Sequence, residues 1–336
     1  MGRGAELTRE IESRIDRKAP PPAAELAEDM AAACEVLEGE APERRPRDDA
    51  DRSGGVIRLL PDIPTVVLPD IHARIDLLVK AMITSFPEHG IEDPLLMAID
   101  AGRAQLVMVG DYVHGEARVR DRWAAAYGEF LDGYRRREAM DAEMYESLTS
   151  LQIVSLLKRA YPEHVHGLKG NHENIANEEG YGNHAFGKFA NEGAMVSDYM
   201  DRFYPGEAFD GVYRFEHDLP LLAVGDNFVV THAEPARFFT FDEIRTYRDR
   251  PEVVEGLTWT DNGAAAPGSV AETVAHMLPE VPSQDAIHLG GHRPVSGLYA
   301  LRAEGQYVQF HNPGRLIAAL PPRTRSFDPE SDIVEL

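Results

Sequence analysis

The sequence predicts an α/β protein, and three observations support this prediction. From about residue 56 onward, short apolar runs alternate with stretches of helical spacing. Helical stretches such as residues 75–85 and 148–159 separate the early runs, an order typical of βαβ units. The chain has 336 residues, 43% hydrophobic and 27% charged, which is enough for a sizeable core and excludes a wholly disordered protein.

The apolar runs predict strands in order along the chain. They fall at residues 64–68, 106–109, 164–168, 221–224, 228–231 and 287–289, with further strands near Tyr299 and at 307–310. The tripeptide Gly225-Asp226-Asn227 between two of these runs predicts a hairpin.

The first 55 residues differ from the rest in composition. They are rich in Ala, Glu, Arg and Pro and contain no aromatic residue. The segment PPPAA separates two short helical patterns, and APERRPRDDADRSGG is typical of a linker. We therefore predict an N-terminal helical arm and linker over 1–55, a main domain over 56–320 with a helical insertion at 117–147, and a C-terminal tail over 321–336.

Charge and cysteine content limit the partners and the compartment. The net charge of −23 repels phosphate backbones, which argues against nucleic acid as a partner. It also suits a site that attracts divalent cations, although a solvated acidic surface explains it equally well. The polar start and the lack of a long apolar run predict neither a secretory signal nor a membrane span. The single cysteine, Cys34, excludes an internal disulfide, and we expect a cytoplasmic protein.

Polar residues follow five of the predicted strands directly. They are Asp70 with His72, Asp111, Asn171, His232 and His292. Ligands gather at the carboxyl ends of strands in α/β sheets, so these side chains are expected at one edge. A single aspartate after a strand is more often a helix N-cap, but five strand ends in succession favour a shared site.

This set of side chains indicates the kind of metal. Mixed carboxylate, imidazole and amide ligands suit Mn, Fe, Zn or Co better than Ca. Six ligands are too many for one open catalytic ion, but they suffice for two ions that share a bridging carboxylate.

The motifs DIH, GDYVHGE, GNHE, VVTHAEP and GGHRP, in this order, resemble those of the calcineurin-like metallophosphoesterases. The resemblance is closest to the phosphoprotein phosphatase branch, because YPEHVHGLKGNHE, DLPLLAVGDNFVVTHAEP and GLTWTDNG also agree with it. It covers about residues 64 to 296. It implies a four-layer α/β/β/α sandwich of two mixed sheets, with the metal site at the carboxyl-terminal edge of the strands.

The resemblance also implies a role for each motif residue. Asp70 and His72 would hold a first metal ion, and Asp111 would bridge it to a second. The second ion would be held by Asn171, His232 and His292. His172 would give a proton to the leaving oxygen, and a metal-bound hydroxide would be the nucleophile.

The sequence departs from the branch where the family has an aspartate followed by an arginine. Here these positions are His114 and Gly115. His114 either contacts the substrate phosphate itself, or leaves the orientation of His172 to an acid. The acids that would replace the family aspartate are Glu116, Glu173 and Glu234. The cations that would replace the family arginine are Arg250 by its family position and, with less support, Arg74 and Arg293.

The first prediction is therefore a two-metal enzyme that hydrolyses phosphomonoesters, including those of serine/threonine-type phosphoproteins. The alternative is a hydrolase of nucleotides, dinucleoside polyphosphates or phosphodiesters. A non-catalytic metal-binding scaffold has less support, because every expected ligand is present.

Overall fold

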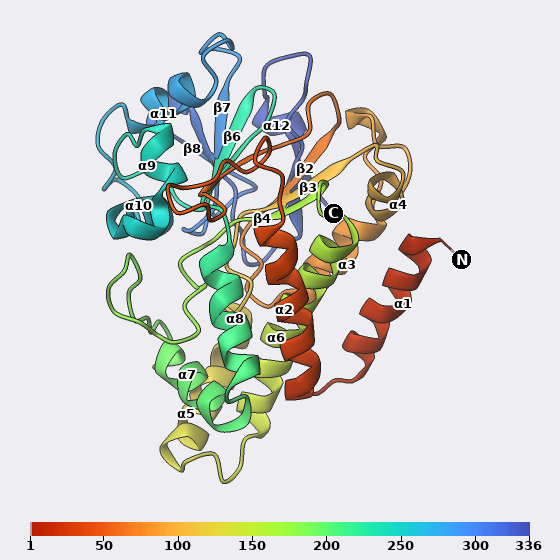
Figure 1. The fold of residues 1–336 in the computed structure, drawn as a ribbon, viewed down its shortest axis with the longest axis vertical. Helices are drawn as coiled ribbons and strands as arrows, with labels where there is room; N and C mark the ends of the chain where they lie inside the picture. Colours follow the sequence, from red (N-terminus) through yellow and green to blue (C-terminus); the bar gives the residue numbers. More distant parts are fainter. Residues whose placement is uncertain (1) are drawn as a thin grey trace.

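The computed structural model describes residues 2–336, which form two β-sheets packed between helices (Figure 1). The five-stranded sheet has the order β11 (Ile333–Glu335), β10 (Ile317–Ala319), β2 (Thr65–Leu68), β3 (Gln105–Met108) and β4 (Val165–Gly167). The six-stranded sheet has the order β1 (Val56–Arg58), β5 (Leu222–Val224), β6 (Phe228–Thr231), β7 (Ile287–Gly290), β9 (Tyr307–Gln309) and β8 (Ala300–Arg302). Both sheets contain parallel and antiparallel pairs, which confirms the predicted fold class.

Alternation along the strands produces the layers. In β2, Val66 and Leu68 belong to the core beneath the helices, while Val67 between them belongs to the core between the sheets. In β6, Val230 faces the core between the sheets, and Val229 packs with a different helical layer. Successive side chains of a strand point to opposite faces, so a strand that is apolar on both faces is covered on both.

Helices cover the outer face of each sheet (Figure 1). On the six-stranded sheet these are α9 (Phe241–Arg245), α10 (Pro251–Thr258) and α11 (Ser269–Met277). The core on the five-stranded side includes α3 (Ile75–Ile83), α4 (Leu95–Asp100), α5 (Arg120–Leu131), α6 (Glu138–Ala160), α7 (Glu192–Phe203) and α8 (Glu207–Asp218). Short 3-10 helices lie at Pro87–His89, Ala117–Val119, Tyr247–Asp249 and Ala303–Gly305. None of the helices within residues 2–336 is both long and apolar enough to cross a membrane.

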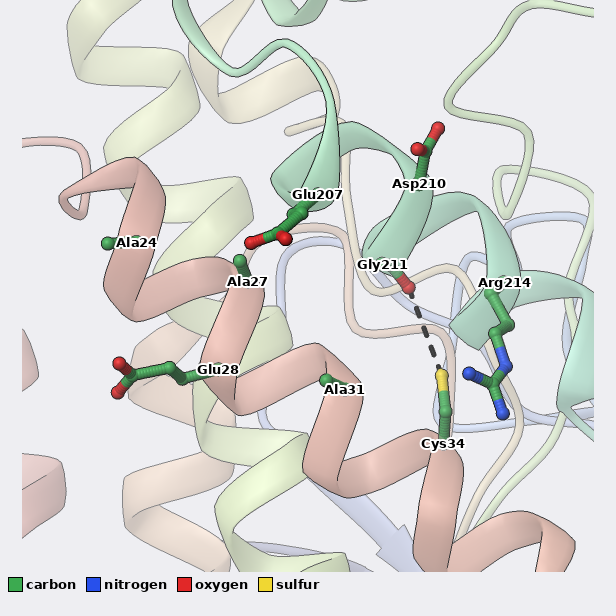
Figure 2. Close-up of a pocket in the computed structure, with 9 residues that line it drawn as sticks. All are labelled: Ala24, Ala27, Glu28, Ala31, Cys34, Glu207, Asp210, Gly211 and Arg214. Carbon is green, nitrogen blue, oxygen red and sulfur yellow. Dashed lines mark hydrogen bonds between the residues drawn. The ribbon is translucent and has the colours of Figure 1, made fainter.

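The predicted arm consists of α1 (Arg3–Asp16) and α2 (Ala23–Glu38), and both helices join the main core. Figure 2 shows α2 beside α8, where Ala27, Ala31 and Gly211 leave a groove of about 500 Å³. Cys34 lies in this contact, with its Sγ 3.9 Å from the carbonyl oxygen of Gly211. Burial raises the pKa of the Cys34 thiol to about 12, so the thiol is unreactive at neutral pH.

A buried group of charges, here called the arm ion cluster, ties the arm to the core. Its members are Glu40, Arg45 and Lys158. Glu40 accepts hydrogen bonds from Arg45 Nη1 at 2.9 Å and from Lys158 Nζ at 2.6 Å. Arg45 also donates to the carbonyls of Gly54 and Asp218. The segment predicted as a linker is therefore packed against the domain, because its basic residues find partners there.

The strand predictions are confirmed to within about one residue, and β5 and β6 form the predicted hairpin. Three strands of three residues each, β1, β10 and β11, were not predicted. The last of these corrects the predicted tail, since β11 pairs with β10 and follows α12 (Pro329–Asp332). An apolar pattern of three residues is too short to be recognised from the sequence. The proposed domain limits otherwise stay predictions.

Candidate metal centre

The six residues predicted as metal ligands converge at one edge of the sandwich. They follow β2, β3, β4, β6 and β7, whose carboxyl ends meet there. We call this group, which also includes one unpredicted histidine, the metal centre. Its members are Asp70, His72, Asp111, Asn171, His232, His292 and His311, and their exposed fractions are all 8% or less.

The two aspartates of the metal centre each have one bonded and one unpartnered oxygen. Asp70 Oδ1 accepts the backbone N–H of His292 at 3.2 Å, and Asp111 Oδ1 accepts that of His172 at 2.9 Å. Neither Oδ2 has a hydrogen-bond partner within residues 2–336, and both are buried. Burial, together with the carboxylates of Asp70 and Glu173, raises the pKa of Asp111 well above its usual range. Ionised aspartates here require a cation.

The imidazoles of His72 and His232 point one nitrogen outward and one inward. The outward Nδ1–H groups donate to the carbonyls of His114 at 3.0 Å and Val109 at 3.2 Å. This leaves the Nε2 lone pairs facing inward, 3.4 Å and 3.5 Å from Asp111 Oδ2. An outer acceptor of this kind fixes the tautomer and orientation of metal-binding histidines.

Asn171 completes a second set of converging atoms. Its Oδ1 lies 2.9 Å from both His232 Nε2 and His292 Nδ1. The described residues contain three overlapping groups whose ligand atoms lie within 4.8 Å of one another, and Asp70 and Asp111 each belong to two of them. The groups are Asp70/His72/His311, His72/Asp111/His172 and Asp70/Asp111/His232. The donor set and its unpartnered oxygens fit divalent metal ions.

Strained backbone and close glycine contacts build this geometry. His72, Asp111 and His292 adopt left-handed φ values of 45°, 53° and 65°, which are costly for residues with a side chain. A Cβ at Gly170 would overlap Asp111 Oδ1, and one at Gly291 would overlap Asp70 Oδ1.

Glu173 holds two of these loops together. It is fully buried, and its carboxylate accepts the backbone N–H groups of Asp111, Tyr112 and Gly170 at 2.7–2.8 Å. This role differs from the one predicted for Glu173 as a candidate acid, which was to orient His172.

His114 contacts His172 directly. Their Nδ1 atoms are 3.1 Å apart, and the ring of Phe186 packs on both, with centroid distances of 4.6 Å and 4.3 Å. Burial lowers the pKa of His114 to about 3. Burial, with the imidazoles of His72 and His114, lowers the pKa of His172 well below its usual range. The structure therefore places His114 in contact with His172, where an acid was expected to act.

The predicted insertion supports the main chain of this variant loop. Trp123 Nε1–H donates to the Gly115 carbonyl at 2.7 Å, and Glu143 accepts the Gly115 N–H at 2.7 Å. Ser147 Oγ accepts the N–H of His114 at 3.1 Å. The two helices α5 and α6 thus hold the loop through its backbone.

The three arginines proposed to grip phosphate are engaged elsewhere. Arg74 is buried and donates to the carbonyls of Asn312 and Arg315. Arg250 donates to Thr246 within its own segment, and Arg293 pairs with Asp261. The structure brings none of them into the hydrogen bonds of the metal centre within the described chain.

Glu116 and Glu234 also have partners other than His172. Glu234 accepts from Arg302 Nε at 2.8 Å. Glu116 accepts from the half-exposed Lys188 Nζ at 3.0 Å and lies 3.7 Å from His72 Nε2. Lys188, which the sequence analysis did not single out, is therefore a cation beside the centre, as is Arg118, which donates to the carbonyls of His72 and Ala73 at 3.5 Å and 3.1 Å.

His311 is the member of the metal centre that the sequence analysis missed. It follows β9, is fully buried, and its Nδ1 lies 3.8 Å from Asp70 Oδ2. The same signal that identified the other ligands was present, since His311 comes directly after the predicted strand 307–310.

An α/β/β/α sandwich whose strand ends bring together two carboxylates, an amide and several imidazoles defines a metal-dependent hydrolase of the phosphoesterase class. A model of the calcineurin-like phosphoesterase family matches residues 63–318, more than half of the chain. The chain belongs to this family and is a metal-dependent phosphoric ester hydrolase.

One solved structure agrees on the fold at low sequence identity. A protein serine/threonine phosphatase from Saccharomyces cerevisiae with similarity to human phosphatase PP5 is 14% identical, with a TM-score of 0.56 over 94% of this chain and 89% of that one. A cold-active protein-tyrosine phosphatase of a psychrophilic Shewanella species is 14% identical, with a TM-score of 0.46 over 80% of this chain and 81% of that one. A search of curated proteins gives no significant match.

Proposed function

We propose that the protein hydrolyses phosphomonoesters with two divalent ions held in the metal centre. The observation that carries this proposal is the pair of buried, unpartnered oxygens, Asp70 Oδ2 and Asp111 Oδ2, surrounded by inward-facing imidazole nitrogens. Asp70 and His72 would hold one ion, Asn171, His232 and His292 the other, with Asp111 between them.

Bound ions would supply positive charge to the phosphoryl oxygens and lower the pKa of water. The protein's own contribution at the leaving group rests on the pair of His114 and His172. When His114 donates its Nδ1–H to His172 Nδ1, the proton of His172 sits on Nε2, which lies 3.9 Å from Asp111 Oδ2. In that tautomer, neutral His172 stabilises the leaving oxygen by a hydrogen bond from Nε2–H and keeps its proton.

A neutral donor favours particular substrates. It assists less than an imidazolium, so phosphates with good leaving groups are hydrolysed faster than alkyl phosphates. A groove of about 540 Å³ that reaches the residue after His292 would hold the rest of the substrate. It is lined by Trp259, Asp261, Arg293 next to His292, and His184 on the segment that carries Phe186. Its mixed charges and aromatic ring suit a phosphopeptide segment.

Hydrolysis of nucleotides, dinucleoside polyphosphates or phosphodiesters is the second candidate. One observation favours it: no arginine of the described chain forms a bidentate contact at the centre, and such a fork is what a monoester dianion requires most. Lys188 would provide a single point charge instead.

Side chains also support proposals on the metal ions and the cellular location. Imidazole with carboxylate ligands favours Mn, Fe, Zn or Co, and we propose two such ions. A cytoplasmic location is proposed on the single, buried cysteine.

The test compares Mn-supported hydrolysis of an aryl phosphate monoester with that of the matching diester. We expect monoester preference, abolished in the Asp111→Asn variant. Diester preference would place the second candidate first. No turnover of either substrate by a chain that binds two ions would contradict both candidates and favour a binding scaffold.

A further inference from the structure

His311 resembles the other imidazoles of the metal centre in how it is held. Its Nε2–H donates to Glu116 Oε2 at 2.8 Å, which leaves the Nδ1 lone pair facing inward. Nδ1 is buried and has no hydrogen-bond partner among residues 2–336. A buried nitrogen without a partner calls for an explanation, and here it faces an equally unpartnered oxygen, Asp70 Oδ2.

The distance between these two atoms fits a shared ion. His311 Nδ1 lies 3.8 Å from Asp70 Oδ2, too far for a hydrogen bond. Two ligands that each lie about 2.1 Å from one ion are about 3.0–4.2 Å apart, depending on the angle between them. His72 belongs to the same group, and its ring centroid lies 5.3 Å from that of His311.

Glu116 has the contacts of a residue that orients a ligand. One oxygen accepts from His311, while the other accepts from Lys188 Nζ at 3.0 Å and lies 3.7 Å from His72 Nε2. Its charge is therefore shared with a lysine and an imidazole. A carboxylate behind a histidine fixes the tautomer and makes the inner nitrogen a better ligand.

We propose that His311 is a further ligand of the ion held by Asp70 and His72, and that Glu116 is its positioning residue. This inference rests on the proposed two-ion site. It makes the two positions similar, since each then has two imidazoles and a share of Asp111. A second imidazole at the first position favours Fe, Co or Zn over Mn there.

The test measures metal binding directly, by equilibrium dialysis against Zn²⁺ or Co²⁺ and elemental analysis, with the visible spectrum of the Co²⁺ form as a second readout. Wild type should bind two ions per chain. His311→Ala should bind one of them about 100-fold more weakly, and Glu116→Gln should weaken the same ion about tenfold. Both variants should leave the other ion unchanged.

His288→Gln is the matched control, because His288 is also fully buried, bonds through Nε2 to Thr231 and has an unpartnered Nδ1, but belongs to none of the groups of converging ligand atoms in the described chain. It should bind both ions as wild type does, and circular dichroism checks that every variant is folded. Two ions bound by His311→Ala with wild-type affinity and an unchanged Co²⁺ spectrum would overturn the inference alone. A wild-type chain that binds no ion would overturn the proposed function together with it.

Discussion

The arm ion cluster and the metal centre both bury charged side chains, but they balance the charge in opposite ways. In the arm ion cluster, Glu40 is met by Arg45 and Lys158, and the remaining donors reach backbone carbonyls. In the metal centre, Asp70 Oδ2 and Asp111 Oδ2 have no hydrogen-bond partner within residues 2–336. Since an uncompensated buried charge costs several kcal/mol, the first cluster is complete as folded and the second requires cations.

The pKa values reflect the same difference. Burial alone would raise the pKa of Glu40, but Lys158, His166 and Arg45 together outweigh it and hold that pKa well below its usual range. The pKa of Asp111 moves the other way, because burial and neighbouring carboxylates dominate there. A buried acid with its own cations is a structural element, whereas a buried acid without them marks a binding site.

Removal of the metal ions should give the largest effect, because only the metal centre depends on them. We expect EDTA to lower the unfolding temperature of wild type, because ions at 1,000 times their Kd contribute about 4 kcal/mol. Asp111→Asn should lose hydrolysis by about 10³-fold or more and respond much less to EDTA. Thermal unfolding with and without EDTA measures this. The control is Asp49→Asn, an exposed aspartate paired with Arg245, which should behave as wild type. An equal response to EDTA in Asp111→Asn would contradict the assignment.

Removing the acid of the arm ion cluster should lower stability but leave metal binding and hydrolysis unchanged. Glu40→Gln leaves Lys158 and Arg45 buried without a counter-charge, and we expect a loss of about 3–5 kcal/mol in the free energy of unfolding. Urea denaturation measures it. Metal stoichiometry and turnover per folded molecule should not change. Adding Lys158→Met should recover part of the loss, and a loss below about 1 kcal/mol in the single variant would show that the cluster is not structural.

Adding a carboxylate next to His172, beside the metal centre, should have a smaller effect, seen in the choice of substrate. His114→Asp would place a negative charge beside His172 Nδ1 and raise the pKa of His172. We expect hydrolysis of an alkyl phosphate to rise about tenfold relative to an aryl phosphate, because alkyl leaving groups depend more on proton donation. The ratio of the two rates is the readout. His114→Asn, similar in size but uncharged, should leave the ratio unchanged, and an unchanged ratio in both variants would refute a role for this contact.

Most of the fold and six of the seven members of the metal centre could be predicted from the sequence. Strands are visible as apolar runs, and parallel strands bring their carboxyl ends to one edge, so a polar residue after each run has a known place. His311 obeys the same rule but lies outside the recognisable motifs. Three-residue strands such as β11 carry too little periodicity to be seen.

Side-chain partners could not be predicted, because they depend on which loops meet. The contact between His114 and His172 joins residues 58 positions apart, and that between Glu116 and His311 joins residues 195 apart. The sequence offered Glu116, Glu173 and Glu234 as equal candidates to orient His172. Only the packing of the loops shows that each carboxylate has a different partner.

The support that α5 and α6 give to the variant loop has a consequence for how this protein can change over time. Trp123, Glu143 and Ser147 hydrogen-bond to the backbone of His114 and Gly115, and the Trp123 ring also lies 6.3 Å from the His114 ring. Deleting the two helices would leave the Gly115 N–H and carbonyl without these partners. The two helices and the loop therefore change together, and the choice of residue 114 is narrow, because His114 is buried at a left-handed φ of 64° and packs on Phe186.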